Sequence, residues 1–145
     1  MSTDANAAMG NAAMAKPRPR PTTTSQRYWD ALAAERIDLQ RCDDCGAWVH
    51  YPRARCTHCL SANLSWQEVE GRGEVYSFSV ARQPTAPPFA DEVPQIITVV
   101  ELPEGVRLTT TLVDVDPAAV RVGLPVVPVF DHGDDDITLL RYRPA

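Results

Sequence analysis

The spacing of apolar and polar residues changes twice along the chain. Residues 1–24 show no apolar period, whereas residues 25–36 show the spacing of a short helix with one apolar side. From residue 37 onwards, short runs of alternating apolar and polar residues are separated by turn-forming residues, which is typical of β-strands. The pattern therefore predicts one N-terminal helix followed by a mainly β chain.

The predicted helix begins after Ser25, which can cap it, and continues to Arg36. Tyr28, Trp29 and Leu32 lie on one side of this helix. A helix this short is marginally stable alone in water, so these aromatic side chains need a cover. Either the domain itself or a partner protein can supply it.

The alternation after residue 36 predicts eight strands, and two prolines restrict where one of them can lie. The predicted strands are 37–41, 48–52, 64–69, 74–81, 95–102, 106–115, 124–131 and 137–143. Asp116 and Pro117 favour a short helical turn before the penultimate strand. Pro125 and Pro128 interrupt that strand, so we expect it to lie at an edge or to be bulged.

The strands after residue 64 favour a small closed barrel. Tyr76, Phe78 and Val80 lie on one face of the strand 74–81, as a core stripe would. Five or six short antiparallel strands with no βαβ unit fit the OB-fold best, and an open sandwich is the competing layout. The connection 82–94 is long enough to carry function of its own.

All four cysteines lie in two Cys-x-x-Cys pairs, Cys42 with Cys45 and Cys56 with Cys59. Two such pairs can place four thiolates tetrahedrally around one metal ion, which predicts zinc and leaves iron open. Two disulfides would need an oxidising compartment, and no secretory signal is visible. Four protein ligands leave no open position for substrate, so we expect a structural metal site.

The charge distribution argues against a general nucleic-acid binder. The net charge is −5, but residues 1–26 carry +2, so the remaining chain carries −7. Binding to phosphates needs a basic surface. No apolar run approaches the length of a membrane span. With no export signal visible, we expect a cytoplasmic protein.

The first 24 residues predict a disordered tail. The alternation of basic residues and prolines from Lys16 to Pro21 blocks helix formation and favours an extended conformation. Residues of this kind usually form a solubilising tail. The alternative is a basic arm that touches an acidic partner.

Motifs for catalysis are missing from the sequence. It has no nucleophile-elbow motif, no Walker loop and no dinucleotide-binding fingerprint. His50, His58 and His132 are scattered and do not pair with a nucleophile in a recognisable motif. Asp134, Asp135 and Asp136 lack the spacing of a calcium loop and indicate a solvated acidic turn. The residues alone therefore favour a binding or structural protein, which is not catalytic by itself.

The order of these features resembles the DUF35 proteins, which join a rubredoxin-like zinc ribbon to an OB-fold. The similar stretches are Tyr28-Trp29 with Leu32, then 39–46, Pro52-Arg53, 56–59, 71–77, Val93-Pro94, 113–117, 122–126 and 141–144. The resemblance covers about residues 26–145. With the residue pattern it divides the chain into an N-terminal helix at 25–36, a zinc ribbon at 37–63 and an OB-fold domain at 64–145. The predicted disordered tail at 1–24 lies outside the resemblance.

The resemblance also implies a role. DUF35 proteins are non-catalytic partners of acyl-CoA enzymes, above all of the thiolase superfamily, including lipid-transfer-protein-type retro-aldolases of steroid side-chain degradation. Other members partner thiolases, acyltransferases or hydratases. The small subunit supports folding and can help form the passage for the acyl-CoA. The resemblance implies Cys42, Cys45, Cys56 and Cys59 as metal ligands and no catalytic residue in this chain.

Apolar surface beyond the needs of a small barrel suggests a docking face. Tyr28, Trp29, Trp48 and Phe89 supply it, and aromatic residues are favoured at interface cores. We expect the helix, the ribbon and the loop 82–94 to contact the partner. The rival interpretations are an OB-fold and zinc-ribbon binder of single-stranded nucleic acid and a free-standing acyl-CoA-binding protein.

Overall fold

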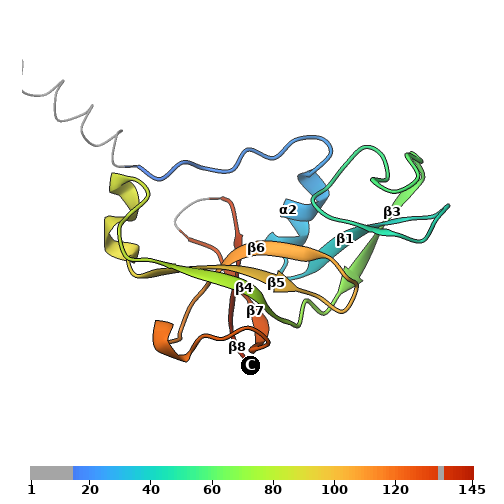
Figure 1. Cartoon of the computed structure of the whole chain (residues 1–145). Helices are drawn as coiled ribbons and strands as arrows, with labels where there is room; N and C mark the ends of the chain where they lie inside the picture. Colours follow the sequence, from blue (N-terminus) through green and yellow to red (C-terminus); the bar gives the residue numbers. More distant parts are fainter. Residues whose placement is uncertain (1–14, 134–135) are drawn as a thin grey trace, which may run out of the picture.

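The computed structural model describes residues 15–133 and 136–145, which form a helix, a ribbon sheet and a barrel (Figure 1). The helical elements are α2 (Gln26–Ala33), η1 (Pro87–Glu92) and η2 (Pro117–Ala119). The strands are β1 (Ile37–Cys42), β2 (Trp48–Val49), β3 (Leu64–Val69), β4 (Gly73–Ala81), β5 (Gln95–Glu101), β6 (Arg107–Leu112), β7 (Pro125–Asp131) and β8 (Leu139–Pro144). The prediction of a mainly β protein with one N-terminal helix is confirmed.

Helix α2 is shorter than the sequence suggests. It buries Tyr28 and Leu32 in the core of the chain itself, so the domain and not a partner covers these two side chains, and it ends at Ala33. Ser25 precedes it, but its hydroxyl accepts the Thr22 N–H (2.9 Å) instead of capping the helix. The backbone of Ser25 is already in the α region, whereas a capping side chain needs an extended residue there.

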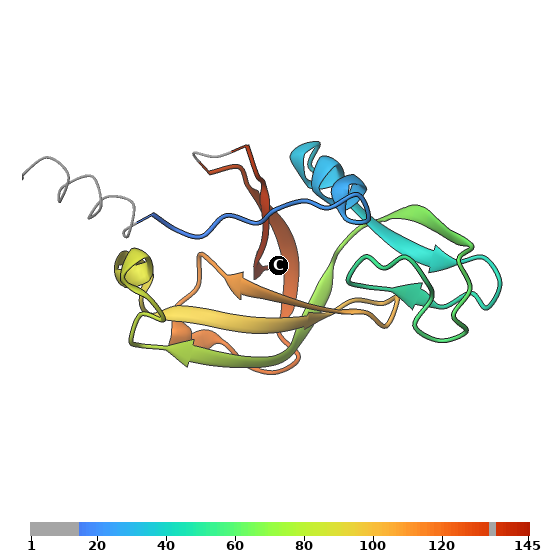
Figure 2. The same ribbon diagram turned by 90° about the horizontal axis from the view of Figure 1, so that it is seen from above.

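The metal-binding half of the chain is built on a three-stranded sheet in the order β2-β1-β3. β3 pairs with the whole of β1, from Ile37 opposite Val69 to Cys42 opposite Leu64. The sequence grouped strand 64–69 with the barrel, but its hydrogen bonds place it in the ribbon sheet. The domain boundary at residue 64 stays a prediction. Figure 2 shows the ribbon sheet extending to one side of the barrel.

The other half is a closed barrel in the order β4-β5-β6-β8-β7. β6 and β8 run parallel and meet at Leu112 and Tyr142, while the other neighbours are antiparallel. β7 pairs with β8 along its length but with β4 only at Gly73 and Glu74. Pro128 therefore lies in a strand with one largely free edge, which confirms the predicted edge position. The predicted OB-fold barrel is confirmed.

The ribbon sheet and the barrel share one hydrophobic core. The core residues are Tyr28, Leu32, Ile37, Leu39, Val75, Ile96, Val100, Leu102, Val106, Leu108, Leu112, Val120, Val126 and Tyr142. Those before residue 40 come from α2 and β1, and the rest come from the barrel half of the chain. The helix thus packs between the two halves, as Figure 1 shows. Cys42 and Cys56 form a separate, smaller cluster with Val49.

One predicted core stripe is wrong. Tyr76 and Phe78 are 45% and 36% exposed, and Val80 is half-buried. The β4–β5 register shifts between Val75 and Ser77, which is a β-bulge, and Val75 takes the core position. Beyond the bulge β7 no longer pairs with β4, so this part of β4 lacks a neighbour on one side.

The described part of the N-terminal segment contacts the barrel half. Lys16 Nζ lies 2.5 Å from Glu92 Oε1 and 5.8 Å from the centroid of the Phe89 ring. The segment then runs from η1 to α2 (Figure 2). Residues 1–14 of the predicted disordered tail lie outside the described residues. No helix among the described residues is long and apolar enough to cross a membrane.

Candidate metal centre and cleft

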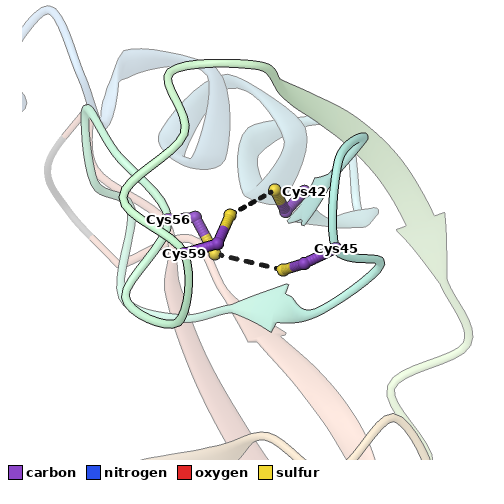
Figure 3. A group of neighbouring side chains, drawn as sticks. All are labelled: Cys42, Cys45, Cys56 and Cys59. Carbon is purple, nitrogen blue, oxygen red and sulfur yellow. Dashed lines mark hydrogen bonds between the residues drawn. The ribbon is translucent and has the colours of Figure 1, made fainter.

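Four cysteine sulfurs converge at the end of the ribbon sheet (Figure 3). Cys42 Sγ lies 3.5 Å from Cys59 Sγ, and Cys45 Sγ lies 3.6 Å from Cys56 Sγ. All four sulfurs lie within 4.8 Å of one another. A tetrahedron with metal–sulfur bonds of about 2.3 Å has sulfur–sulfur edges of about 3.8 Å. The four side chains therefore fit one tetrahedral metal ion, as the spacing predicted.

The two halves of the site repeat one backbone pattern. In each, the N–H of the first cysteine donates to the carbonyl five residues later (2.8 Å), and the N–H four residues later donates to that cysteine's carbonyl (2.9 and 3.1 Å). The residue four positions on is Gly46 in the first half and Leu60 in the second, with φ of +74° and +64°. The short turns bring both sulfurs of each pair to one side.

Backbone N–H groups favour the thiolate form of Cys56, which is the form that binds a metal. Those of Cys59 and His58 lower the pKa of the Cys56 thiol to about 6. The His58 N–H lies 3.3 Å from Cys56 Sγ. The His58 side chain is exposed and is not part of the described metal-binding cluster.

A second feature is a cleft of about 720 Å³ between α2, the N-terminal segment, the loop 82–94 and strands β6 and β8. Tyr28, Trp29 and Phe89 line it, so three of the four aromatic residues predicted for partner binding lie together. Tyr28 is mostly core, with 8% of its surface exposed, whereas Trp29 and Phe89 are half-buried. OB-fold proteins commonly use this region of the barrel for ligands.

Trp48 lies apart from the other three predicted residues. It is in β2, half-buried, with the Arg41 guanidinium 5.2 Å from the centroid of its ring. It does not line the cleft. The residues predicted for docking are thus divided between the cleft and β2, where Trp48 packs against the shared core.

His50 and Tyr51 are cleft residues that the sequence did not single out. Burial lowers the pKa of His50 to about 4, so its ring is neutral at pH 7. Tyr51 is 48% exposed, and its hydroxyl accepts the Thr109 N–H (3.2 Å). The only sequence feature that marks these two residues is their position directly after β2.

The charge of the cleft differs from that of the whole chain. None of the described residues that line it is Asp or Glu, although the chain has 19 acidic residues. Arg20 and Arg141 do line it. Arg141 Nε is bound to Asp131 (2.7 Å), and its Nη1 is bound to the Thr111 hydroxyl (2.5 Å). The cleft is therefore apolar with basic margins.

The fold and the four-sulfur site define a protein that joins a rubredoxin-like ribbon to an OB-fold barrel. Residues 29–65 match the family model of the ChsH2 rubredoxin-like zinc ribbon domain. Residues 66–131 match that of the ChsH2 C-terminal OB-fold domain. The chain belongs to the DUF35 family.

Relatives in the family have names that point to enzyme complexes and scaffolds. A DUF35 domain-containing scaffold protein of Methanothermobacter thermautotrophicus is 33% identical, over 79% of this chain and 90% of that protein. A probable enoyl-CoA hydratase alpha subunit of Thermomonospora curvata is 38% identical over 90% of this chain. The 3-oxo-4,17-pregnadiene-20-carboxyl-CoA hydratase alpha subunit of Mycobacterium tuberculosis is 36% identical over 75% of this chain.

The match to the two hydratase subunits is partial. The chain spans 40% and 34% of their lengths. A solved structure is covered more completely: a chain of the Ltp2-ChsH2(DUF35) aldolase is 37% identical, with a TM-score of 0.79 over 88% of this chain and 98% of that chain.

Proposed function

We propose that this protein is a non-catalytic accessory subunit that binds and supports an acyl-CoA enzyme of the thiolase superfamily. The observation that carries the proposal is the likeness to a chain of the Ltp2-ChsH2(DUF35) aldolase over 98% of that chain. The partner is a thiolase or a lipid-transfer-protein-type retro-aldolase, with steroid side chains as the candidate substrates, and a hydratase is the other option. The complex works in the cytoplasm.

The arrangement of the described histidines supports a non-catalytic role. His132 is hydrogen-bonded to the Thr138 hydroxyl (3.0 Å) and to Glu35 (3.1 Å), an arrangement like that of a catalytic triad. However, Thr138 is only 5% exposed, so a substrate cannot reach its hydroxyl. These contacts tie the loop before β8 to the end of α2. His50 packs against tyrosine rings and has no nucleophile as a hydrogen-bond partner.

The proposed cofactor is zinc, held by all four cysteines in a structural role. Four thiolates around one ion suit zinc and leave no position for substrate. Elemental analysis of the purified chain should give one zinc per chain. An equimolar amount of iron with visible absorption would assign the site to iron instead.

The proposed docking face includes Trp29 and Phe89 in the cleft, backed by Tyr28, and Trp48 on the ribbon. Large aromatic residues at an interface core often cost more than 2 kcal/mol when truncated. We expect Trp29→Ala with Phe89→Ala to weaken partner binding at least tenfold, as measured by calorimetry, with circular dichroism unchanged. Trp48→Ala tests the ribbon separately. Full affinity in the double variant with an intact fold would exclude the cleft as the docking face.

The deciding experiment is affinity capture of the tagged full chain from its native cells, followed by mass spectrometry. The expected result is a thiolase-like protein in near-equal amount. Acyl-CoA turnover by that partner should require or be increased by this chain, while the isolated chain turns over none. A chain recovered alone, or one that hydrolyses or binds acyl-CoA without a partner, would contradict the proposal.

One observation keeps single-stranded nucleic acid binding as a second candidate. Tyr76 is exposed with the Arg107 guanidinium 3.7 Å from its ring centroid, and such pairs can stack on bases. However, Arg107 is also bound to Glu101 (2.8 Å), and the chain is acidic. Salt-dependent binding of a labelled oligothymidine that is lost in Tyr76→Ala would favour this candidate.

A further inference from the structure

The barrel closes between β6 and β8 through very little strand pairing. Within the described strands these two pair at a single position, Leu112 opposite Tyr142. Since they are parallel, they diverge from that point towards their N-terminal ends. The cleft lies in the resulting gap, because it is lined by the consecutive residues 108–111 of β6 and 139–141 of β8. Successive side chains of a strand point to opposite faces of the sheet. A cleft lined by consecutive residues of a strand therefore lies along the edge of that strand.

On the N-terminal side of its pairing with β8, the edge of β6 carries backbone groups without a strand partner. The Val113 N–H donates to the Tyr142 carbonyl (2.8 Å), and the Thr109 N–H donates to the Tyr51 hydroxyl (3.2 Å). Both therefore point away from β5. Backbone groups alternate between the two edges of a strand, so those of Arg107 and Thr111 point the same way. Residues 107–111 thus offer a short edge of about 16 Å.

Beyond its tie to β8 through the Thr110 hydroxyl, which donates to the Leu140 carbonyl (2.8 Å), this edge is covered by side chains and the N-terminal segment. The Tyr51 hydroxyl takes the place of one strand hydrogen bond, although its side chain is 48% exposed. Pro19 and Arg20 of the N-terminal segment also line the cleft. Proteins commonly blunt free strand edges with loops and side chains, since an uncovered edge recruits other chains.

The chemistry of the cleft indicates what could add to the edge. Thr109, Thr110 and Thr111 form a strand of high β-propensity. Trp29 and Phe89 offer apolar contacts on either side. The absence of acidic residues among the described lining, together with Arg20, favours an occupant with negative charge, whereas Arg141 is already paired with Asp131. An extended peptide with apolar and acidic residues satisfies the backbone, apolar and charge features together, whereas a small apolar ligand leaves the edge N–H and C=O groups unpaired.

We propose that an extended, acidic segment of the partner subunit docks in this cleft as an added strand beside β6, pairing with residues 107–111 and displacing the Tyr51 hydroxyl from Thr109. This inference rests on the proposed function, because the segment belongs to the captured enzyme subunit. Strand addition supplies affinity through main-chain hydrogen bonds and specificity through side-chain pockets.

The first test compares Thr109→Pro with Thr109→Ala in the full chain. Proline removes the N–H that faces the cleft but leaves the β5 side of the strand intact, and prolines are tolerated at strand edges. We expect Thr109→Pro to weaken binding of the captured partner at least tenfold and Thr109→Ala by less than threefold. Tyr51→Phe frees the Thr109 N–H in the unbound chain and should tighten binding by about two- to tenfold.

Hydrogen exchange on the wild-type complex tests the same point without a variant. The amides of residues 107–111 should exchange more slowly in the complex than in the free chain.

Arg20→Glu should weaken binding, more at low than at high salt, whereas Arg121→Glu should not. Arg121 follows η2, which lies on the side of the barrel away from α2 (Figure 1).

The outcomes separate this inference from the proposed function. If an enzyme subunit is captured but Thr109→Pro binds it normally, or residues 107–111 gain no protection, strand addition is wrong and the accessory role stands. If protection of these residues comes from a small molecule without a partner, the cleft is a ligand site and strand addition is wrong. If no enzyme subunit is captured, both fail.

Discussion

His50 stacks between two tyrosines, with ring centroids 5.6 Å from Tyr28 and 4.1 Å from Tyr51. Its pKa of about 4 lies below the value of about 6.5 in an unfolded chain. Between these values the unfolded chain binds a proton that the folded chain does not. The stability that depends on neutral His50 is therefore complete above pH 6.5 and is lost as the pH falls towards 4.

The expected loss is about 2 kcal/mol between pH 7 and 5, because each pKa unit corresponds to about 1.4 kcal/mol. Urea unfolding of His50→Leu in zinc-saturated buffer should show a shallower loss over this range than the wild type. His58→Gln changes an exposed histidine and should keep the wild-type slope. Equal slopes for His50→Leu and the wild type would show that His50 is not held neutral by the fold.

Gln40 fixes the chain that leads into the second cysteine pair. Its buried amide donates to the Arg53 carbonyl (2.9 Å) and accepts the Arg53 N–H (2.8 Å), as a paired strand would. Gln40→Leu should cost about 2 kcal/mol by leaving these groups unpaired, and it should speed zinc release to a chelator. Gln67→Leu, an exposed position on β3, is the control and should release zinc at the wild-type rate. Unchanged release from Gln40→Leu would show that this contact does not hold the site together.

At the scale of single residues, the sequence predicted a residue's place where the chemistry of that residue alone restricts it. The four cysteines could be predicted because their spacing alone constrains the metal geometry. Pro128 could be placed at an edge because it lacks an N–H. The exposure of Tyr76 and Phe78 could not be predicted, since the irregularity after Val75 that accompanies it has no clear signal in the sequence. Alternation identifies a strand, but a bulge changes which face points inward.

At the scale of elements, Gly71 joins the ribbon to the barrel. With a φ of +77°, it sits where an added Cβ would lie 2.2 Å from Ile37 Cδ1 and 3.5 Å from Pro128 Cγ. Its carbonyl accepts the Tyr142 hydroxyl (2.8 Å). Gly71→Ala should lower the free energy of unfolding by about 2–4 kcal/mol, from left-handed strain and overpacking.

Gly105→Ala is the matched control for this prediction. Gly105 has a φ of +86°, but an added Cβ there would meet nothing within 4 Å, so only the strain of about 1–2 kcal/mol should remain. Ile37→Val removes the clashing methyl group and should reduce the cost of Gly71→Ala in a double-mutant cycle. If Gly71→Ala costs no more than Gly105→Ala in denaturant unfolding, the close packing at Gly71 is not important.

Strand positions could be read from the sequence, but strand partners could not. β3 lies where the alternation placed it, yet it joins β1 in a six-residue antiparallel ladder instead of opening the barrel. Periodicity reports that a strand has a buried face and says nothing of which edge it joins. The cleft could not be predicted for the same reason, because Arg20, Tyr51 and Thr109 come from three distant parts of the chain and meet only in the fold.

At the scale of the whole molecule, the shared core decides how the two halves respond to metal loss. Ile37 and Leu39 of the ribbon sheet are each 1% exposed and pack in the same core as barrel residues. The metal holds the cysteine turns, and binding energy at such a site is folding energy for the segment that supplies the ligands. The destabilisation caused by loss of the ion should therefore reach the barrel through β1 and not remain in the ribbon.

We expect the metal-loaded chain to unfold in one thermal transition, and chelation to lower its midpoint while exposing β5 to faster hydrogen exchange. A Cys45→Ser, Cys59→Ser variant should behave like the chelated wild type and should not respond to added chelator. The comparison is made by calorimetry and by exchange at β5, which lies in the barrel and supplies no ligand. Two separate transitions, or β5 protection that survives chelation, would mean that the barrel is stable without the ribbon. In that case the metal would serve the ribbon's docking surface around Trp48 and not the barrel.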